Sequence, residues 1–203
     1  MPRITAILDY WFGELDAAGL PEPAVEQRWF TRDDTVDAEI RARFEADLRS
    51  AAAGRLRRWE AEARGALALV LLFDQFPRNM YRDTPRAFLF DEHARAVARR
   101  ALEAGHAEAL RPIQRVFLYM PFEHAEDPAL QEESVQRFGA LVEAVPEAQR
   151  EHFRAYLAHA EQHRDVIARF GRFPHRNALL GRESTAEEQA YLDDRAPAWG
   201  QRS

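Results

Sequence analysis

Cysteine and lysine are both missing from this chain of 203 residues. Without cysteine there is no disulfide, no thiolate nucleophile and no cysteine-ligated zinc or iron–sulfur site. All 28 basic residues are arginine, which excludes Schiff-base chemistry, attachment of pyridoxal phosphate and a lysine-containing phosphate loop. The four serines lie outside any Gly-x-Ser-x-Gly motif, and no Gly-x-Gly-x-x-Gly motif is present. We therefore predict neither a cofactor nor a serine hydrolase.

The chain also lacks an excess of basic over acidic residues and has no long apolar run. Thirty-four acidic residues against 28 basic ones give a net charge of −6, which argues against nucleic acid as a partner. No run approaches the 18 apolar residues of a membrane span. The apolar stretch Ile4–Phe12 is short, contains Asp9 and is not followed by a signal-peptide cleavage site. We expect a cytoplasmic protein with no membrane partner, and the sequence leaves a homo-oligomer open.

The helical period dominates the chain from end to end. No segment alternates with period two between hairpin signals, so we predict an all-α fold. We expect about nine helices in antiparallel pairs, as one domain over residues 1–195, with a frayed tail at 196–203. Apolar spacing, caps, prolines and glycines place the first helices at Ile4 to Gly13, in a short segment ending at Phe30, at Asp33 or Asp34 to Gly54, and at Ala66 to Phe73, where Asp74–Pro77 ends the helix. The next helices are expected at Thr84–Pro85 to Gly105, Pro112 to Pro121, Asp127–Pro128 to about Ala144, and Pro146 to Gly171. The last helix runs from Ser184, which forms a capping box with Glu187, to Leu192.

The first candidate site follows the buried helix Ala66–Phe73. Asp74 stands where an acid is disfavoured both by burial and by the negative end of a helix. Arg78 and Arg82 are near in sequence, and Asn79 lies between them. Either Asp74 forms a buried ion pair that fixes the loop, or it is a carboxylate of perturbed pKa in a pocket.

The second candidate is the segment from Pro121 to Asp127. Asp127 has a structural role as a helix cap, whereas Glu123 and His124 have none that the sequence shows. A glutamate and a histidine are the residue types of an acid–base pair. The alternative is an ordinary solvated loop.

The third candidate is a polar stripe on one face of the long helix, formed by His152, Tyr156, His159 and His163. His159 and His163 have the spacing of metal ligands, but Glu161 stands one position away from where a zincin requires it. We favour a partly exposed helix face for His152 and His159 and predict no metal site. His163 is the histidine that we expect at a binding site.

The fourth candidate is the loop Phe170–Asn177. Arg172 and Arg176 supply cations, His175 a titratable group and Asn177 an amide, although the same groups could instead cap neighbouring helices. Phe173 precedes a proline after a buried helix, so we expect it in the core. We expect Arg176→Ala to abolish ligand binding at a modest cost in stability.

We predict that the segments Asp74–Arg82, Glu123–Asp127 and His175–Asn177 meet around one polar pocket. The pocket would bind a small anionic molecule through its arginines and asparagines, and Glu123 with His124 or His175 would move a proton. The alternative is a non-catalytic helical array that binds a peptide.

Four segments also resemble a known bacterial family, catalogued as domain of unknown function 924. They are Leu8-Asp-Tyr-Trp-Phe-Gly13, Phe73–Arg82, Tyr119-Met-Pro-Phe-Glu-His-Ala-Glu-Asp127, and Phe170–Asn177 followed by Gly181-Arg-Glu-Ser-Thr185. The resemblance extends from about Ile4 to Leu192. It implies an all-α, tetratricopeptide-like fold and assigns no activity and no catalytic residue.

Overall fold

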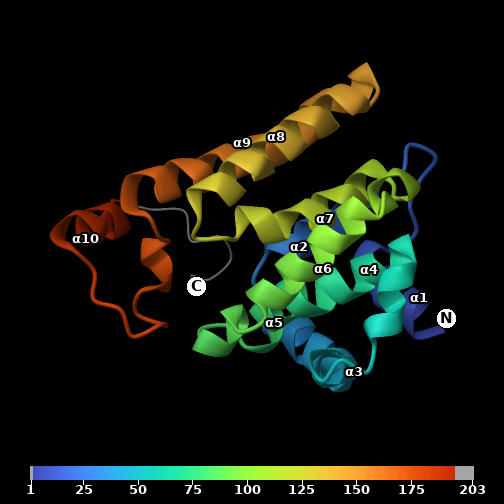
Figure 1. The fold of residues 1–203 in the computed structure, drawn as a ribbon, viewed down its shortest axis with the longest axis horizontal. Coiled ribbons are helices and arrows are strands. Elements are labelled where there is room, and N and C mark those ends of the chain that lie inside the picture. Colours follow the sequence, from blue (N-terminus) through green and yellow to red (C-terminus); the bar gives the residue numbers. More distant parts are fainter. Residues whose placement is uncertain (1, 195–203) are drawn as a thin grey trace. The chain divides into compact units, whose positions relative to one another are not determined.

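The computed structural model describes residues 2–194, and within this range the regular structure is helical (Figure 1). The one β-type contact there is an isolated bridge between Leu15 and Pro21. The described residues divide into two compact units, residues 2–118 (unit 1) and 119–194 (unit 2). The all-α prediction is confirmed. The single domain and the tetratricopeptide-like pairing stay predictions, and the tail at 196–203 lies outside the described residues.

Unit 1 contains most of the helices. They are α1 (Pro2–Phe12), α2 (Pro23–Phe30), α3 (Asp34–Ala52), α4 (Ala63–Val70), α5 (Phe76–Met80), α6 (Asp91–Glu103) and the first part of α7 (Pro112–Glu123), with short 3₁₀ turns at Arg57–Ala61, Pro85–Phe88 and His106–Ala109. Helix α4 packs against α1 and α6, and α5 packs against α3. A buried aromatic cluster links α1, α2 and α7: the Trp29 ring lies 4.6 Å from Phe117, and Trp11 lies 5.5 Å from Phe117.

The central helix of unit 1 runs further than the sequence predicts. It does not end at Asp74 but continues through a π-turn, Leu71–Gln75, into α5. In this wider turn the N–H of Phe76 donates to the carbonyl of Leu71, five residues back. Pro77 follows the π-turn directly, in the first turn of α5. With α4, the π-turn and α5 taken as one helix, the described residues contain nine α-helices.

Three other predicted boundaries are wrong. Pro121 does not end its helix, because α7 continues to Glu123 with the proline inside it. Thr84–Pro85 opens only a 3₁₀ turn, and α6 begins at Asp91. The last capping box is formed by Thr185 and Glu188 instead of Ser184 and Glu187.

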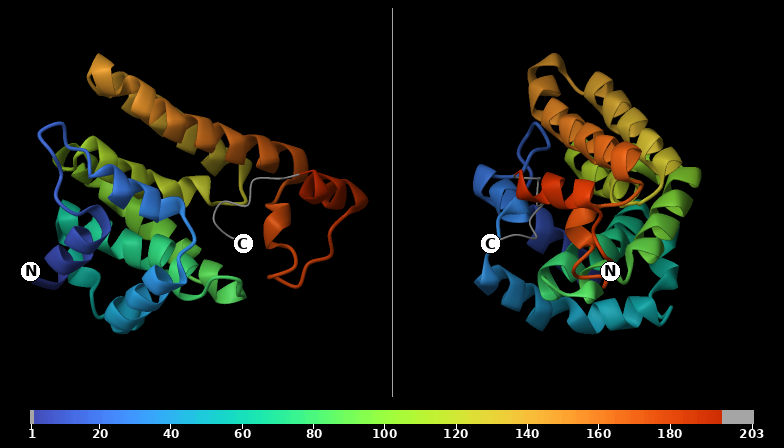
Figure 2. Two further views of the ribbon diagram at one scale, coloured as in Figure 1. Left: turned by 180° about the vertical axis from the view of Figure 1, so that it is seen from behind. Right: turned by 90° about the vertical axis from the view of Figure 1, so that its left-hand side faces the viewer.

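Unit 2 is built on a pair of helices, α8 (Pro128–Ala144) and α9 (Glu147–Phe170). Two residues connect them and they pack along their lengths, so they form an antiparallel hairpin, which is seen from several sides in Figures 1 and 2. Asp127 caps α8 as predicted, and Gly171, at φ 69°, ends α9. A 3₁₀ turn, Pro174–Arg176, and α10 (Ala186–Asp193) complete the unit.

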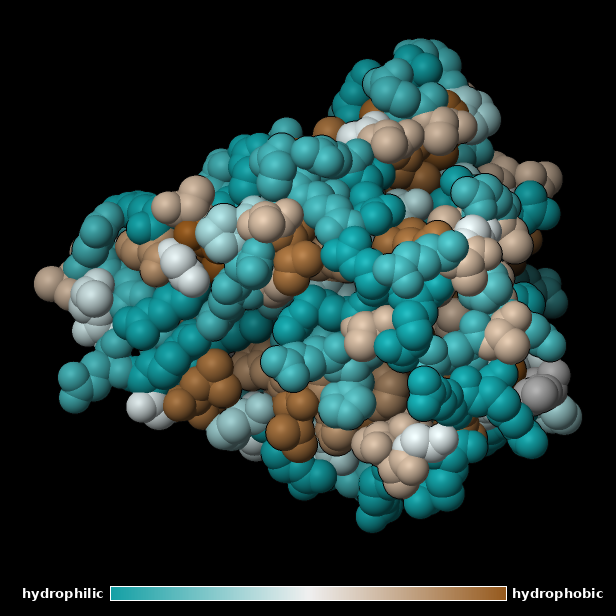
Figure 3. Space-filling view, in the orientation of Figure 1, coloured by the Kyte–Doolittle hydropathy of each residue, from teal (hydrophilic) through white to brown (hydrophobic). Residues whose placement is uncertain are grey.

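The face drawn in Figure 3 is mainly hydrophilic, with hydrophobic residues in small separate groups. Among the described residues, Phe30, Leu89 and Leu180 are the large hydrophobic side chains that are exposed. No helix within residues 2–194 combines the length and the apolar character needed to cross a membrane.

Candidate functional site

The strongest cluster of chemically active groups lies in unit 2, at the corner where α7 ends. Glu123 is the last residue of α7, and its side chain is buried. Gln131 of α8 is also fully buried, and its amide donates hydrogen bonds to the carbonyls of Glu123 (2.6 Å) and Ala125 (2.7 Å). Asp127 accepts from the N–H groups of the first turn of α8. The corner is therefore fixed by hydrogen bonds on both sides.

His163 of α9 meets the Glu123 carboxylate at this corner. Its Nδ1 lies 3.0 Å from Oε1 of Glu123 and 2.8 Å from the carbonyl oxygen of His159, one helical turn earlier. His163 is buried, as Glu123 is. The sequence singled out both residues but did not predict that they are partners.

The Glu123 carboxyl is charged despite its burial. Burial by itself raises its pKa, but the charge and hydrogen bond of His163, with smaller contributions from His124 and His159, outweigh that effect. The pKa of Glu123 therefore lies below its ordinary value. A buried carboxylate next to an imidazole is thus present at neutral pH.

His124 is half-buried beside the pair. Its ring centroid lies 6.0 Å from that of His163. Within the described residues, donor atoms of Glu123, His124 and His163 lie within 4.8 Å of one another, close enough to hold a metal ion. This group contains His163 but not the exposed His159, so the histidine pair with metal-ligand spacing in the sequence is not the one that the structure assembles.

Phe173 forms a wall of the cluster. The ring is fully buried and lies edge-on to His163 at 5.5 Å. The backbone N–H of Phe173 donates to Glu126 at 2.8 Å, and Arg182 binds the same carboxylate at 2.6 and 2.9 Å. Burial by itself raises the pKa of Glu126. These hydrogen bonds and the charge of Arg176 outweigh that effect, so the pKa of Glu126 lies below its usual range. The segment Glu123–Asp127 and the loop after α9 are therefore in contact, while the predicted common pocket of three segments stays a prediction.

His175 and Arg176 lie around the same ring. The His175 ring is 5.6 Å from Phe173, and the Arg176 guanidinium lies over it at 4.5 Å. Arg176 is only 6% exposed. The side chain thus packs inside the unit, and the modest stability cost expected of Arg176→Ala stays a prediction.

Arg172 and Asn177 have structural partners. Arg172 binds Glu188 through two hydrogen bonds of 2.6 and 2.8 Å. Asn177 donates to Glu188 (3.3 Å) and accepts from Arg182 (3.0 Å). Hydrogen bonds from Arg172, from the Thr185 backbone and from Asn177 lower the pKa of Glu188 to about 2. These contacts tie the loop 171–185 to α10, which is the capping role that the sequence offered as the alternative.

The remaining predicted site residues belong to unit 1. Asp74 is fully buried, and Arg78 reaches both Asp74 (3.3 Å) and Asp91 (3.0 Å). This is the buried ion pair that the sequence offered as one of two alternatives for Asp74.

Asn79 and Arg82 both bind Asp37 of α3, at 2.7 and 2.6 Å. The meeting of the segment Asp74–Arg82 with the two segments of unit 2 stays a prediction.

Sequence reasoning gave no role to Gln131, Glu126 or Glu188, although each holds part of the site or its loop. Gln131 alone left a signal, since it stands on the buried face of α8 where an apolar residue is usual. Glu126 and Glu188 look like ordinary surface acids in the sequence, because their arginine partners come from segments distant along the chain.

Comparison with known proteins settles the family. Residues 7–196 match the family described as bacterial protein of unknown function (DUF924). The chain belongs to this family. The DUF924 chain is also similar to a solved structure, the protein of unknown function ATU0120 from Agrobacterium tumefaciens, with 38% identity and a TM-score of 0.80. The similarity covers 95% of this chain and 98% of that one. No curated protein matches the chain.

Proposed function

We propose that unit 2 carries an acid–base site that acts on a small anionic molecule, with His163 moving the proton and Glu123 orienting it. The observation that supports this most is the position of Nδ1 of His163, which has two oxygen acceptors: Glu123 at 3.0 Å and the His159 carbonyl at 2.8 Å. Two acceptors at one ring nitrogen favour the tautomer with its proton on Nδ1. Nε2 then carries the lone pair that a general base needs.

Glu123 has the role of an orienting carboxylate. It is charged and buried, and it stabilises the imidazolium that forms when Nε2 takes up a proton. His124 is the second group within reach, so it can supply or accept the proton at another substrate atom. Positioned groups of this kind contribute roughly 10²–10⁴-fold to a reaction rate.

The anionic character of the substrate is supported by Arg176. Its guanidinium and the His163 ring contact the same Phe173 side chain, so a cation lies one ring away from the proton-transfer pair. An arginine fork recognises a carboxylate or phosphate with two hydrogen bonds. The His175 ring also lies against the Phe173 ring, so it adds a third histidine near the proton-transfer pair.

A metal-assisted reaction is the second candidate, because one observation favours it. The donor atoms of Glu123, His124 and His163 lie within 4.8 Å of one another, and a set of two histidines and a glutamate is one that catalytic zinc uses. A bound ion would attract the same anionic substrates. The peptide-binding alternative has no comparable support from the described residues.

Imidazole nitrogen NMR tests the proposal without knowledge of the substrate. Long-range ¹H–¹⁵N spectra identify the protonated nitrogen of His163, with His163→Gln as the assignment variant. We expect the proton on Nδ1 and a shift of the His163 signals on addition of malonate or inorganic phosphate. Arg176→Gln should abolish that shift, whereas the control Arg154→Gln, at an exposed position of α9, should retain it. A proton on Nε2, or signals indifferent to both anions, would contradict the proposal.

Elemental analysis of the purified protein separates the two candidates. One equivalent of a transition metal, lost in His163→Gln and on treatment with a chelator, would replace the metal-free mechanism by the metal-assisted one. Protein without metal that keeps its response to malonate supports proton transfer by the side chains alone.

A further inference from the structure

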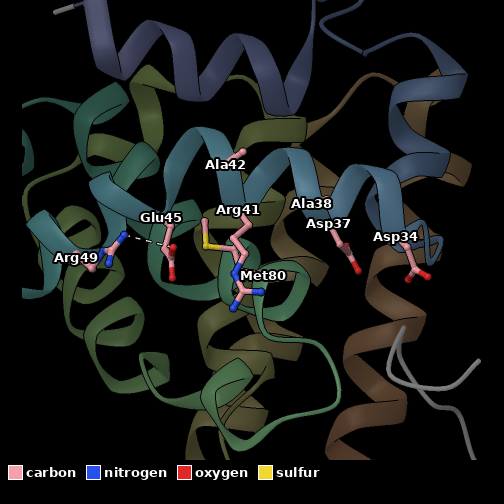
Figure 4. A pocket seen from close by; sticks show the side chains of 8 residues that line it. All are labelled: Asp34, Asp37, Ala38, Arg41, Ala42, Glu45, Arg49 and Met80. Atoms are coloured by element: carbon pink, nitrogen blue, oxygen red, sulfur yellow. Dashed lines mark hydrogen bonds and ion pairs between the residues drawn. The ribbon is translucent and has the colours of Figure 1, made fainter.

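A second site, in unit 1 and built from other residues, is a hollow along the outer side of α3. Its volume is about 480 Å³, within the range of small-molecule pockets. Its lining comes from α3 between residues 34 and 49 and from Met80 of α5 (Figure 4). None of these residues was a candidate in the sequence.

Small side chains create the hollow. Ala38 and Ala42 lie one helical turn apart and leave free space where larger residues would stand. Met80 lines the hollow as well and is 5% exposed. The hollow therefore has an apolar surface of two methyl groups and a thioether, surrounded by charged residues.

Two of the charged residues in the hollow already have strong partners. Asp37 accepts two hydrogen bonds from Arg82, at 2.6 and 2.9 Å, and a third from Asn79. Its negative charge is therefore balanced by a guanidinium and is not available to a ligand.

Glu45 is balanced in the same way. It forms an ion pair with Arg49, drawn as a dashed line in Figure 4, and accepts from the Tyr81 hydroxyl at 2.9 Å. The Glu45–Arg49 pair adds no net charge to the hollow.

Arg41 differs from these residues, because no carboxylate within the described part of the chain forms an ion pair with it. Its guanidinium lies 5.3 Å from the Tyr81 ring. Arg86, which likewise has no carboxylate partner among residues 2–194, lies over the same ring at 3.9 Å. Two positive charges without acidic partners thus meet at one buried tyrosine beside the hollow.

Asp34 is the acid that remains, and it lies at the end of the hollow nearest the start of α3. It stands seven residues before Arg41, which is about 10 Å along a helix axis. Its nearest cation is Arg32, at 3.5 Å. The middle of the hollow, at Arg41, therefore carries a positive charge that no lining carboxylate pairs with, whereas the end at Asp34 does not.

We infer that this hollow binds a small organic anion with an apolar body. The acidic group of the ligand pairs with Arg41, and its hydrocarbon part covers Ala38, Ala42 and Met80. Short-chain carboxylates have this chemistry. The inference goes beyond the proton-transfer site of unit 2 and shares no residue with it.

Methionine methyl NMR gives a direct test, because the chain has only three methionines. In protein labelled with ¹³C-methyl methionine, the Met80 signal is assigned with Met80→Leu. We expect hexanoate to shift the Met80 signal and to leave that of Met120 unchanged. Hexanol, which lacks the charge, should bind about tenfold more weakly.

Two arginine variants separate binding from general surface charge. Arg41→Gln should weaken hexanoate binding by about tenfold or more, whereas Arg64→Gln, which removes an exposed arginine of unit 1 outside the hollow, should change it by less than about twofold. An equal loss in both variants, or hexanoate binding unchanged in Arg41→Gln, would overturn the inference. A stronger Met80 shift with hexylammonium than with hexanoate would also overturn it, since the hollow would then select cations.

Discussion

Nδ1 of His163 lies 3.0 Å from Oε1 of Glu123, and both side chains are buried within unit 2. The charge and hydrogen bond of His163, with smaller contributions from His124 and His159, hold the pKa of Glu123 below its ordinary value. Burial penalises a lone carboxylate, and the imidazole offsets that penalty. The pair is therefore sensitive to substitution of either partner.

Glu123→Ala should therefore lower the free energy of unfolding by about 3 kcal/mol, because it removes one partner of a buried pair. Chemical denaturation of the variant and the parent protein measures this. Glu132→Ala, at an exposed position of α8, is the control and should differ by less than about 0.5 kcal/mol. Equal stability of the two variants would show that the pair contributes nothing to folding.

Gln131→Met should destabilise the corner after α7. The substitution keeps the size of the side chain but leaves the carbonyls of Glu123 and Ala125 without their donor. Two unpaired buried carbonyls should lower the free energy of unfolding by about 2–4 kcal/mol. The exposed Gln136→Met is the matched control on the same helix. If the urea midpoints of both variants equal that of the parent protein, the two hydrogen bonds from Gln131 do not stabilise the fold.

Acid should weaken the contacts between the loop 171–185 and α10 through Glu188. Its pKa is about 2 in the folded protein, with Arg172 as the largest cause, and about 4.3 in an unfolded chain. A lowered folded pKa means that the unfolded state takes up the proton first as pH falls. The stabilisation is therefore complete above about pH 4.5 and is lost progressively between about pH 4.5 and 2.

Unfolding measured from pH 7 to pH 2 tests this in the parent protein and in Glu188→Gln. The variant should be less stable at pH 7, and the difference should shrink as the pH falls below about 4.5. A difference independent of pH would mean that the charge of Glu188 is not what holds the loop.

Phe173→Ala should destabilise unit 2 by about 3–5 kcal/mol, because the ring is fully buried against His163 and Arg176. Phe30→Ala provides the comparison, since Phe30 is 50% exposed and its truncation should change stability by less than about 1 kcal/mol. Thermal melts of the two variants measure this. Similar melting temperatures would argue against a core role for Phe173.

Local signals in the sequence were sufficient for most helix ends. Asp33 and Asp127 each accept from N–H groups two and three residues ahead, and Gly171 takes up positive φ, so each boundary depends on a few neighbouring residues. The same local reasoning failed at Asp74–Pro77 and at Pro121. There the surrounding core makes it favourable to continue the helix, through a π-turn in one case and across a proline in the other.

The sequence by itself thus determined the all-α class, the family and most helix ends, and it singled out Glu123, His124, His163 and Arg176 as individual residues. Only the tertiary structure decided their relationships. Glu123 and His163 are forty residues apart, and no local periodicity reports which of many polar groups will meet after the chain closes a loop of that length. The hollow beside Arg41 depends in the same way on Met80 of α5 packing against α3. Helix ends are set by neighbours along the chain, whereas a site is set by neighbours in space.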